Sequence, residues 1–526
     1  MVRNSGPNTN LIDAARGMTL GDQLARQALV NPDLVAYRFG EQTRTFAEID
    51  RRVDRLAGAL VTNGVAHGDR VAILMHNSIE FVEVFWAAAR IGAIAVPINF
   101  RLAAAEVAYI LENCEPVVLV VDDDNADNAD NADAARTDRA ERSPAVVIRV
   151  GADYEAVLTA GDPAIARRNR VALDDPAFII YTSGTTGRPK GAVLSHMNLL
   201  INTYTKIATH GISGDGEVWL SGLSLCHIAG VSGLLPCLLL GGTCVIMPSG
   251  QFDAAEMVDV IEREGVTCCF LVPTQWKEIC AVPDVTHRCR SLRQIAWGGS
   301  NAPLDVLEAM AAALAHAATF NTFGQTEMSP LTCVLRGHDS VRKMGSIGTP
   351  VPNVEVRIVD DEMHDVAADE HGSELGEIVY RGPTVMLGYW NDPVATEAAF
   401  AGGWFHSGDL VRRDRDGFIY VVDRKKDMII SGGENIYSAE VEAVIARHPA
   451  VDEVAVIGMP HPRWVETPVA VIVPKPGVEP PTLADITDWC RAGLASYKKP
   501  TAIRIVDALP RNASGKVLKN ALRRAP

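Results

Sequence analysis

The segment at residues 181–191, YTSGTTGRPKG, has the composition of a phosphate-binding loop. It follows an apolar run and combines hydroxyl side chains, glycines that let backbone N–H groups approach an anion, and one lysine, Lys190. Its spacing, GxxGxxKG, differs from the GxxxxGK[ST] spacing of a Walker loop. A flexible surface loop can also be rich in Gly, Ser and Thr. This segment, however, follows an expected strand and ends in Pro-Lys-Gly, and both features favour nucleotide binding over a flexible loop.

Five further polar motifs follow this loop along the chain. They are TFGQTE at residues 322–327, HSGD at 406–409, DRKKD at 423–427, SGGENIYSAE at 431–440 and PRNASGK at 510–516. The six motifs, in this order, resemble those of the acyl-adenylate-forming superfamily, which includes acyl-CoA synthetases, firefly luciferase and the adenylation domains of peptide synthetases. The resemblance covers nearly the whole chain and is closest to stand-alone fatty-acyl and aryl acid–CoA ligases.

The resemblance implies an enzyme that uses ATP, Mg²⁺ and CoA together with a small-molecule carboxylic acid. Because the acid and ATP are both anionic, bringing them together requires charge neutralisation and alignment. The nucleotide-binding residues that it implies are Thr182, Ser183, Gly184, Thr185, Thr186, Gly187, Lys190, Gly299, Ser300, Asn321, Thr322, Phe323, Gly324, Thr326, Asp409, Arg424 and Lys516.

Three residues are expected to be catalytic: Lys516, His227 and Lys190. Lys516 would place a positive charge at the carboxylate and α-phosphate as the transition state forms. Glu327 and Thr185 would hold Mg²⁺, a hard cation that prefers oxygen ligands. Each residue taken alone has a structural alternative, such as a solvated lysine or a core histidine. Because the motifs occur together and in order, we favour functional roles for the residues that they contain. For His227 a functional and a structural role are equally favoured.

The resemblance also places a hinge at Lys426, which would let one site perform both adenylation and thioester formation. It further indicates where the acyl group and CoA bind. Relatives usually have an aromatic residue in place of Cys226 and a glycine in place of Val465, which puts the pocket shape and the CoA-facing surface in doubt. The candidates for an apolar acyl pocket are His227, Val231, Trp276, Trp297, Gly324 and Met328, and those for a CoA tunnel are Gly432, Gly433 and Glu434.

The elements that must position these residues follow a strand–helix–strand pattern. Residues 70–75 read as a buried strand, Ser78 can cap a helix that runs to about Ile91, and Gly92 ends it. Short apolar strands that alternate with helices predict parallel α/β sheets. Further strands are expected at residues 94–96, 178–181, 218–220, 243–246, 268–272, 294–297 and 319–323, with a helix at 306–315.

The chain changes in character near Lys426. After this point we expect helices at residues 436–448 and 486–495 and strands at 451–457 and 469–473, an α+β unit of ordinary domain size. The predicted fold is therefore α/β, with a large N-terminal domain of parallel-sheet subdomains (residues 1–425) and a small, mobile α+β C-terminal domain (residues 426–526) that carries Lys516.

Length and composition agree with this organisation. A chain of 526 residues exceeds a single hydrophobic core, and its net charge of −16 argues against nucleic acid as a partner. The ten cysteines lack metal-site spacing, residues 1–10 lack an apolar signal segment, and glycines and Pro236 interrupt the most apolar stretch, residues 231–247. These features predict a cytoplasmic protein without an integral membrane segment. The Asp-Asn-Ala repeat at residues 124–132 is expected to form a solvated loop, with a calcium loop as the less favoured alternative.

These motifs predict that the protein is an ATP-dependent acid–CoA ligase. Such an enzyme forms an acyl-adenylate with release of pyrophosphate and then transfers the acyl group to the thiol of CoA. Two alternatives remain. One is an enzyme that loads a separate carrier protein, and the other is a non-catalytic nucleotide-binding protein on the same fold. The presence of Lys190, Glu327, Asp409, Arg424 and Lys516 together weighs against the second alternative. A homodimer and a carrier protein in trans stay possible partners, and the sequence does not specify the acid.

Overall fold

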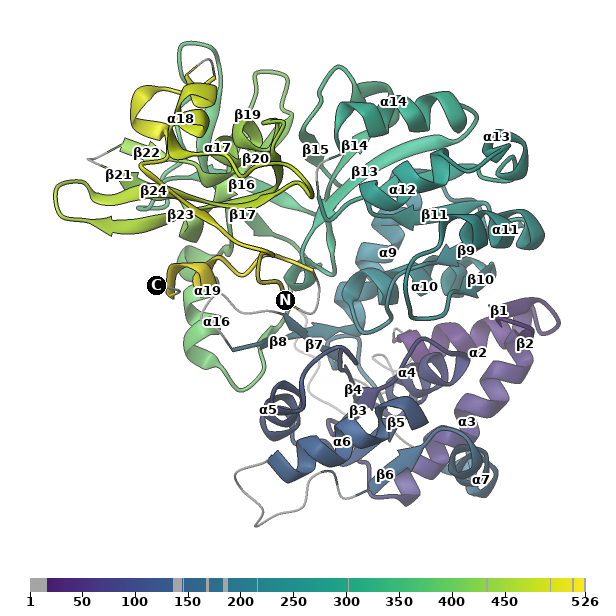
Figure 1. Cartoon of the computed structure of the whole chain (residues 1–526). Helices are drawn as coiled ribbons and strands as arrows, with labels where there is room; N and C mark the ends of the chain where they lie inside the picture. Colours follow the sequence, from purple (N-terminus) through teal and green to yellow (C-terminus); the bar gives the residue numbers. More distant parts are fainter. Residues whose placement is uncertain are drawn as a thin grey trace, which may run out of the picture. The chain divides into compact units, whose positions relative to one another are not determined.

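The computed structural model of the chain describes residues 17–135, 144, 146–166, 170–182, 188–214, 216–300, 302–431, 434–491, 493–512 and 515–524 (Figure 1). The chain divides into two compact units. The first comprises Met1–Glu355 with Arg381–Phe400, and the second comprises Val356–Tyr380 with Ala401–Pro526. The mixed α/β architecture, with a large N-terminal part and a small C-terminal part, confirms the predicted fold class.

One sheet of the first unit has seven strands, of which those at its centre are parallel. It ends in two antiparallel strands, so that the phosphate loop connects antiparallel neighbours, β7 and β8. The strand order is β18 (Gly388–Tyr389), β8 (Lys190–Ser195), β7 (Pro176–Thr182), β4 (Ile94–Pro97), β3 (Arg70–Leu74), β5 (Val118–Val121) and β6 (Val146–Arg149).

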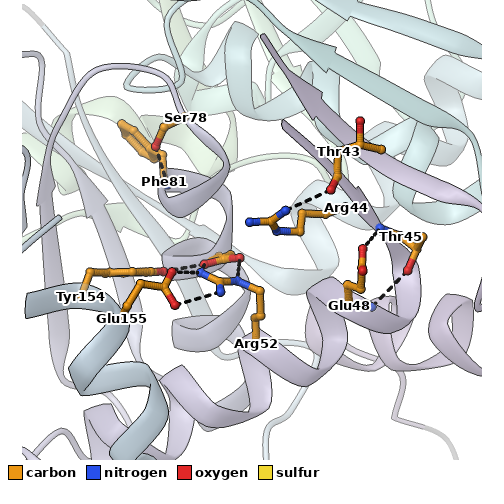
Figure 2. Close-up of polar contacts among 10 residues, drawn as sticks. Thr43, Arg44, Thr45, Glu48, Arg52, Ser78, Phe81, Tyr154 and Glu155 are labelled. Carbon is orange, nitrogen blue, oxygen red and sulfur yellow. Dashed lines mark hydrogen bonds and ion pairs between the residues drawn. The ribbon is translucent and has the colours of Figure 1, made fainter. Parts of the chain in front are cut away.

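Helix α4 (Ile79–Ile91) begins and ends where the sequence predicts. The Ser78 hydroxyl accepts a hydrogen bond from the Phe81 N–H group at 3.1 Å, which satisfies one of the unpaired donors of the first turn (Figure 2). At the other end, Gly92 adopts φ +73°, a left-handed conformation that glycine enters without strain. Local capping chemistry therefore accounts for both boundaries of this helix.

The expectation of a solvated loop at residues 124–132 is wrong, because these residues lie in helix α6 (Asp123–Ala135). The repeat has a period of three, so its alanines fall near one face of a helix. Ala126, Ala129 and Ala132 are all buried, and the last two belong to the hydrophobic core of the seven-stranded sheet. Asp122 accepts a hydrogen bond from the Asn125 N–H group at the start of the helix. The stabilisation gained by burying the alanine face is therefore larger than the cost of ordering this polar segment as a helix.

The second sheet of the first unit is parallel at its centre and antiparallel at both ends. Helix α10 (Ile228–Leu240) and strand β10 together account for the most apolar stretch of the chain. The order within this unit is β15 (Ser346–Pro350), β14 (Leu331–Arg336), β13 (Ala318–Gly324), β12 (Gln294–Trp297), β11 (Cys268–Leu271), β9 (Val218–Ser221), β10 (Thr243–Ile246), β1 (Val35–Phe39) and β2 (Gln42–Thr45).

Helices pack against this sheet and form a large hydrophobic core. The helix predicted at residues 306–315 is α14 (Leu304–Ala313), which is shifted by two residues toward the N-terminus. None of the helices in the described part of the chain combines the length and apolar character that crossing a bilayer requires. The helices that contribute to this core are α11 (Ala254–Glu264), α12 (Pro273–Cys280) and α14 (Leu304–Ala313).

The second unit contains two sheets. One is antiparallel between β17, β19 and β20, and the other joins three antiparallel pairings to one parallel edge strand, β25. The first has the order β16 (Glu355–Val359), β17 (Glu374–Arg381), β19 (Phe405–Arg413), β20 (Ile419–Arg424), and the second has the order β22 (Glu434–Ile436), β21 (Ile429–Ser431), β24 (Val465–Pro474), β23 (Val451–His461), with β25 (Ala502–Ile505) on β24.

The helices of the second unit are shorter than the sequence predicts. The helix expected at residues 436–448 is α17 (Ser438–Ile445), because Ile436 still pairs with Ile429 in a strand. The helix expected at 486–495 is α18 (Leu483–Cys490), which begins earlier because Thr482 caps it. The second unit also places β17, β19 and β20 together with the C-terminal strands. The domain boundary near Lys426 stays a prediction.

A buried histidine links the start of helix α9 (His196–His210) to helix α2 (Leu20–Val30). The Nδ1 atom of His196 accepts a hydrogen bond from the Leu20 N–H group at 3.4 Å, and Nε2 has no partner among the described residues. Burial lowers the pKa of His196 to about 4. The native protein therefore holds this imidazole neutral at pH values where an exposed histidine would be protonated.

We expect this histidine to reduce stability in mild acid. The unfolded chain binds the proton near pH 6.5, whereas the native state binds it near pH 4, so stability falls as pH decreases through this window. The difference amounts to about 2 kcal/mol at pH 5. Urea unfolding at pH 7 and pH 5 should show a smaller acid loss for His196→Gln than for the natural chain. The exposed-site control, His371→Gln, should match the natural chain; an unchanged pH dependence in His196→Gln would contradict the assignment.

Candidate active site

The two ends of the phosphate loop lie side by side. Thr182 and Lys190 are partners in the β7–β8 pairing, and the Thr182 hydroxyl donates to the Lys190 carbonyl at 3.4 Å. Gly191 follows Lys190 where a Cβ atom would come within 2.6 Å of Ile179, so close packing excludes a side chain there. The remaining predicted residues of the loop, Ser183, Gly184, Thr185, Thr186 and Gly187, lie outside the described residues.

Tyr389 brings two predicted site residues together. Its hydroxyl donates a hydrogen bond to Glu327 Oε1 at 3.0 Å, and the ammonium of Lys190 lies 5.1 Å from the centre of its ring. Strand β18, which carries Tyr389, pairs with β8, which begins at Lys190. A cation suited to phosphate and a carboxylate suited to a metal ion therefore lie around one aromatic ring. Tyr389 lies outside the motifs recognised in the sequence, although it stands in a Gly-Tyr-Trp run typical of a structured loop.

Glu327 is suited to a magnesium ion that arrives with ATP. It lies in the short 3₁₀ turn η1 (Thr326–Met328) beside Thr326. In the ranges that the structure describes, no group of three or more His, Cys, Asp or Glu side chains could hold a metal ion by itself. Mg²⁺ commonly uses one or two carboxylates together with substrate phosphates and water. The buried Nε2 atom of Gln325, next to Thr326, has no partner among the described groups, so this motif still has a donor available for a ligand.

We expect Glu327→Gln to raise the Mg²⁺ concentration needed for half-maximal rate. The amide removes the negative charge that would bind the ion but keeps the shape and one oxygen. A Mg²⁺ titration at fixed ATP measures the shift, and Glu106→Gln, at another glutamate of the same unit, is the matched control. The variant Tyr389→Phe should shift the titration less, because it removes only the hydrogen bond that orients the carboxylate. An unchanged titration with a normal KM for ATP would remove Glu327 from the site.

Residues 298–300 and the TFGQTE motif come together at the carboxyl ends of β12 and β13. These strands are parallel neighbours, with Trp297 paired to Asn321. A Cβ atom on Gly298 would lie 2.4 Å from the Thr322 carbonyl oxygen, and Gly299 adopts φ +81°. The Thr322 hydroxyl donates to the Trp297 carbonyl at 3.2 Å. Ligands of α/β sheets commonly bind at such strand ends, which suits the predicted nucleotide-binding role of Gly299, Ser300 and Thr322.

The neighbouring predicted residues have structural tasks that hold this region in place. The side-chain amide of Asn321 is buried and donates to the Ser346 carbonyl at 3.0 Å. A Cβ atom on Gly324 would lie 1.8 Å from the Pro330 carbonyl oxygen, so this position accepts only glycine without a backbone shift. Phe323, Gly299 and Ser300 lie at the same strand ends. The nucleotide role of these residues stays a prediction.

Asp409 and Arg424 form an ion pair in the second unit. They are partners in the β19–β20 pairing, and Arg424 Nε lies 2.7 Å from Asp409 Oδ1. Asp409 is only 2% exposed, and its backbone N–H group donates to the Ser407 hydroxyl. The guanidinium offsets the cost of burying this carboxylate. A fixed carboxylate of this kind can accept hydrogen bonds from two ribose hydroxyls.

The acyl-pocket candidates divide into two groups. His227 is the half-buried N-cap residue of α10, and Val231 and Met328 are fully buried. Trp276 and Trp297 instead belong to the core formed with helices α11, α12 and α14, and Trp276 Nε1 donates to the Ala296 carbonyl at 3.0 Å. Core packing accounts for both tryptophans without a ligand. Their contribution to acid binding stays a prediction, as do those of His227, Val231, Met328 and Gly324.

Cys226, which stands where relatives usually have an aromatic residue, is buried next to Ser224. Its sulfur lies 3.0 Å from the Ser224 hydroxyl, and burial raises the pKa of the thiol to about 11. A thiol that stays protonated at neutral pH is a poor nucleophile. Cys226 is therefore a small packing residue next to His227 rather than a reactive group.

Lys516 lies on a short loop of the second unit. An isolated bridge between Arg511 and Val517 closes this loop, and the Lys516 N–H group donates to Asn512 Oδ1 at 2.9 Å. Gly515, just before Lys516, adopts φ +82°, which favours glycine. The lysine side chain is exposed on a backbone that is held at both ends.

The predicted hinge and CoA-tunnel residues follow β20. Lys426 lies in the 3₁₀ turn η3 (Lys425–Asp427), and Glu434 is the exposed first residue of β22. Gly432 and Gly433 lie outside the described residues. The tunnel assignment therefore stays a prediction.

Comparisons with known proteins agree with these motifs. The family "AMP-binding enzyme" matches residues 24–390, and "AMP-binding enzyme C-terminal domain" matches residues 440–516. The chain is 37% identical to an indoleacetate–CoA ligase from Aromatoleum aromaticum (96% of this chain, 98% of the relative) and 39% identical to a feruloyl-CoA synthase from Amycolatopsis sp (97% and 99%).

A solved structure supports the same relationship. The o-succinylbenzoate CoA synthetase from Bacillus subtilis, in complex with its acyl-adenylate intermediate, matches with a TM-score of 0.84 and 33% identity. The match covers 96% of this chain and 98% of that one. The chain therefore belongs to the AMP-binding enzymes, the acyl-adenylate-forming superfamily that includes the acid–CoA ligases.

Proposed function

We propose that this enzyme, an ATP-dependent acid–CoA ligase, acts on an aromatic carboxylic acid. The observation that carries the adenylation chemistry is the arrangement of Lys190 and Glu327 around Tyr389. The acids named for the three relatives described above support the substrate class, since indoleacetate, ferulate and o-succinylbenzoate all carry an aromatic ring.

The reaction proceeds in two steps. A carboxylate oxygen of the acid attacks the α-phosphorus of ATP, and pyrophosphate leaves. The sulfur of CoA then attacks the acyl carbon, and AMP leaves. Lys190 binds phosphate oxygens, Asp409 accepts hydrogen bonds from the ribose with Arg424 beside it, and Lys516 offsets the charge that develops in the first step. Mg²⁺ would neutralise phosphate charge, with Glu327 and Thr185 as its protein ligands.

Residues among the acyl-pocket candidates, and Cys226 next to His227, suit a ring-bearing acid. Val231 and Met328 are buried apolar side chains, and Cys226 is smaller than the aromatic residue usual in relatives. A smaller side chain leaves more room in an apolar pocket. Binding an aromatic ring there would release apolar surface from water, at about 25 cal/mol for each Å² buried.

An acid panel tests the proposal. Purified enzyme is supplied with ATP, Mg²⁺, CoA and one acid at a time: indoleacetate, ferulate, o-succinylbenzoate, hexanoate or palmitate. AMP formation and the CoA thioester are both measured. We expect the highest kcat/KM with one of the aromatic acids. A higher value with either aliphatic acid would overturn the substrate class, and absence of pyrophosphate release with every acid would favour the non-catalytic alternative.

The thiol acceptor and the location of the enzyme complete the proposal. We assign CoA as the acceptor, with a holo-carrier protein in trans as the competing acceptor in the same assay. All ten cysteines are free, which suits the cytoplasm as a reducing compartment. A homodimer is the expected assembly if the enzyme is not a monomer, and analytical ultracentrifugation distinguishes the two.

A further inference from the structure

A hollow in the first unit is lined mainly by arginines. Its volume is about 310 Å³, and it lies where β2, helix α3 (Phe46–Thr62) and helix α7 (Ala152–Ala160) meet. Of the motifs assigned above to ATP, the acid or CoA, none contributes to its wall. The residues that line the hollow are Arg44, Glu48, Arg51, Arg52, Arg55 and Leu158.

The spacing along α3 gathers this charge on one face. Arg51, Arg52 and Arg55 are separated by one, three and four positions, so successive turns of the helix bring them next to each other. Arg44, on β2, lines the same hollow. The whole chain carries a formal net charge of −16, so an anion that binds here depends on this local group of cations.

Arg52 forms the fixed wall of the hollow. Its guanidinium donates to the fully buried Glu83 at 3.1 Å and to Glu155 at 2.6 Å, and the Tyr154 hydroxyl donates to Glu83 at 2.8 Å. Burial raises the pKa of Glu83, while the hydrogen bonds from Arg52 oppose that shift. Arg52 is therefore held in position by two carboxylates (Figure 2).

The other three arginines form no ion pair with a carboxylate among the described residues. Arg44 donates to the Thr43 carbonyl at 3.1 Å, Arg55 donates to the Thr159 carbonyl at 3.2 Å, and Arg51 makes no ion pair within the described ranges. Glu48, the acidic residue of the lining, accepts from the Thr45 N–H group at 2.8 Å and so serves the capping of α3. Three guanidinium groups thus retain N–H donors that can turn toward a ligand.

We propose that this arginine hollow binds the phosphate group of a small molecule, at a site separate from the nucleotide motifs. Guanidinium forks match the geometry of phosphate oxygens and bind them in pairs. A phosphate dianion needs more than one cation, and the hollow supplies three that are not held in ion pairs. Leu158 gives the wall one apolar side chain, against which the uncharged part of a ligand can rest. The phosphate can come from inorganic pyrophosphate or from a phosphate ester such as CoA.

Chemical modification of arginine tests the site directly. The full-length enzyme is treated with phenylglyoxal, and modified arginines are located by mass spectrometry. The probes are pyrophosphate, CoA and dephospho-CoA, compared with sodium chloride at matched ionic strength. We expect at least a several-fold decrease in modification of Arg51 and Arg55 with pyrophosphate or with CoA. Protection by CoA but not by dephospho-CoA assigns the 3′-phosphate as the bound group, and protection by pyrophosphate assigns the inorganic source.

Binding measurements on variants separate this site from the active site. Calorimetry of the effective probe is performed with AMP present in excess to occupy the nucleotide site, and, where CoA is the probe, the binding that remains in the double variant is assigned to the active site. The double variant Arg51→Gln/Arg55→Gln should weaken binding of the probe by about tenfold, corresponding to about 1.4 kcal/mol, while its kcat with ATP, acid and CoA stays within about twofold. The control Arg263→Gln, at an exposed arginine outside the hollow, should bind as the natural chain does. Equal protection by chloride, or unchanged binding in the double variant, would overturn the proposal.

Discussion

Replacing Lys516 by alanine is expected to abolish acyl-adenylate formation while thioester formation from supplied acyl-AMP is largely retained. The lysine matches the residue that acts in the first half-reaction only. Loss of one preorganised charge in a site that excludes water should lower the rate by about 10²–10³-fold or more. The loop backbone is held by the Arg511–Val517 bridge and by the Asn512 side chain, so the substitution should leave the fold intact.

Two single-turnover assays measure this effect. One follows ATP-dependent formation of acyl-AMP, and the other follows CoA-dependent consumption of acyl-AMP supplied to the enzyme. Lys475→Ala, at a lysine of the same unit outside the motifs, serves as the matched control and should leave both rates unchanged. An equal loss in both half-reactions of folded Lys516→Ala protein would contradict the assigned role.

Replacing Lys426 by proline is expected to slow thioester formation far more than adenylation. One site must perform two reactions with different geometries, and in the second the thiol has to approach where Lys516 acted in the first. Hinges are a few loop residues that absorb large changes in φ and ψ, and proline fixes φ near −65°. Lys426 lies in a 3₁₀ turn between β20 and β21, where a φ of about −60° is usual. Proline should therefore restrict the change in backbone conformation that a hinge at this position requires.

Contacts next to Lys426 indicate what a rotation would have to break. The buried carboxylate of Asp423 accepts hydrogen bonds from the Ser438 hydroxyl at 2.8 Å and from the Ala439 N–H group at 3.3 Å. These bonds tie the end of β20 to the start of α17. Lys426→Ala is the matched control, because it removes the ammonium group and keeps backbone freedom. The same pair of single-turnover rates decides the outcome: equal slowing of both steps, or of neither, would remove Lys426 from the hinge.

Local chemistry made several elements predictable. The Ser78 cap and the left-handed Gly92 define both ends of α4, and short apolar runs correctly placed strands such as β10 and β12. The signals for these elements lie within a few residues of each other, so no knowledge of distant contacts is needed. The helix α6 could not be predicted in this way, because its stability comes from packing Ala129 and Ala132 into a core formed by other segments.

The sequence by itself determined the chemical inventory of this protein: a lysine in a glycine-rich loop, carboxylates in ordered motifs and a lysine near the C-terminus. Only the tertiary structure placed Glu327 against Tyr389, 62 residues away, and joined Asp409 to Arg424 across two strands. It also gathered Arg44 with the arginines of α3 in one hollow. The physical reason is that residue types and spacing encode local backbone preferences and available charges. Which charges face each other depends on strand pairing and burial, and these are decided by interactions between segments far apart in the chain.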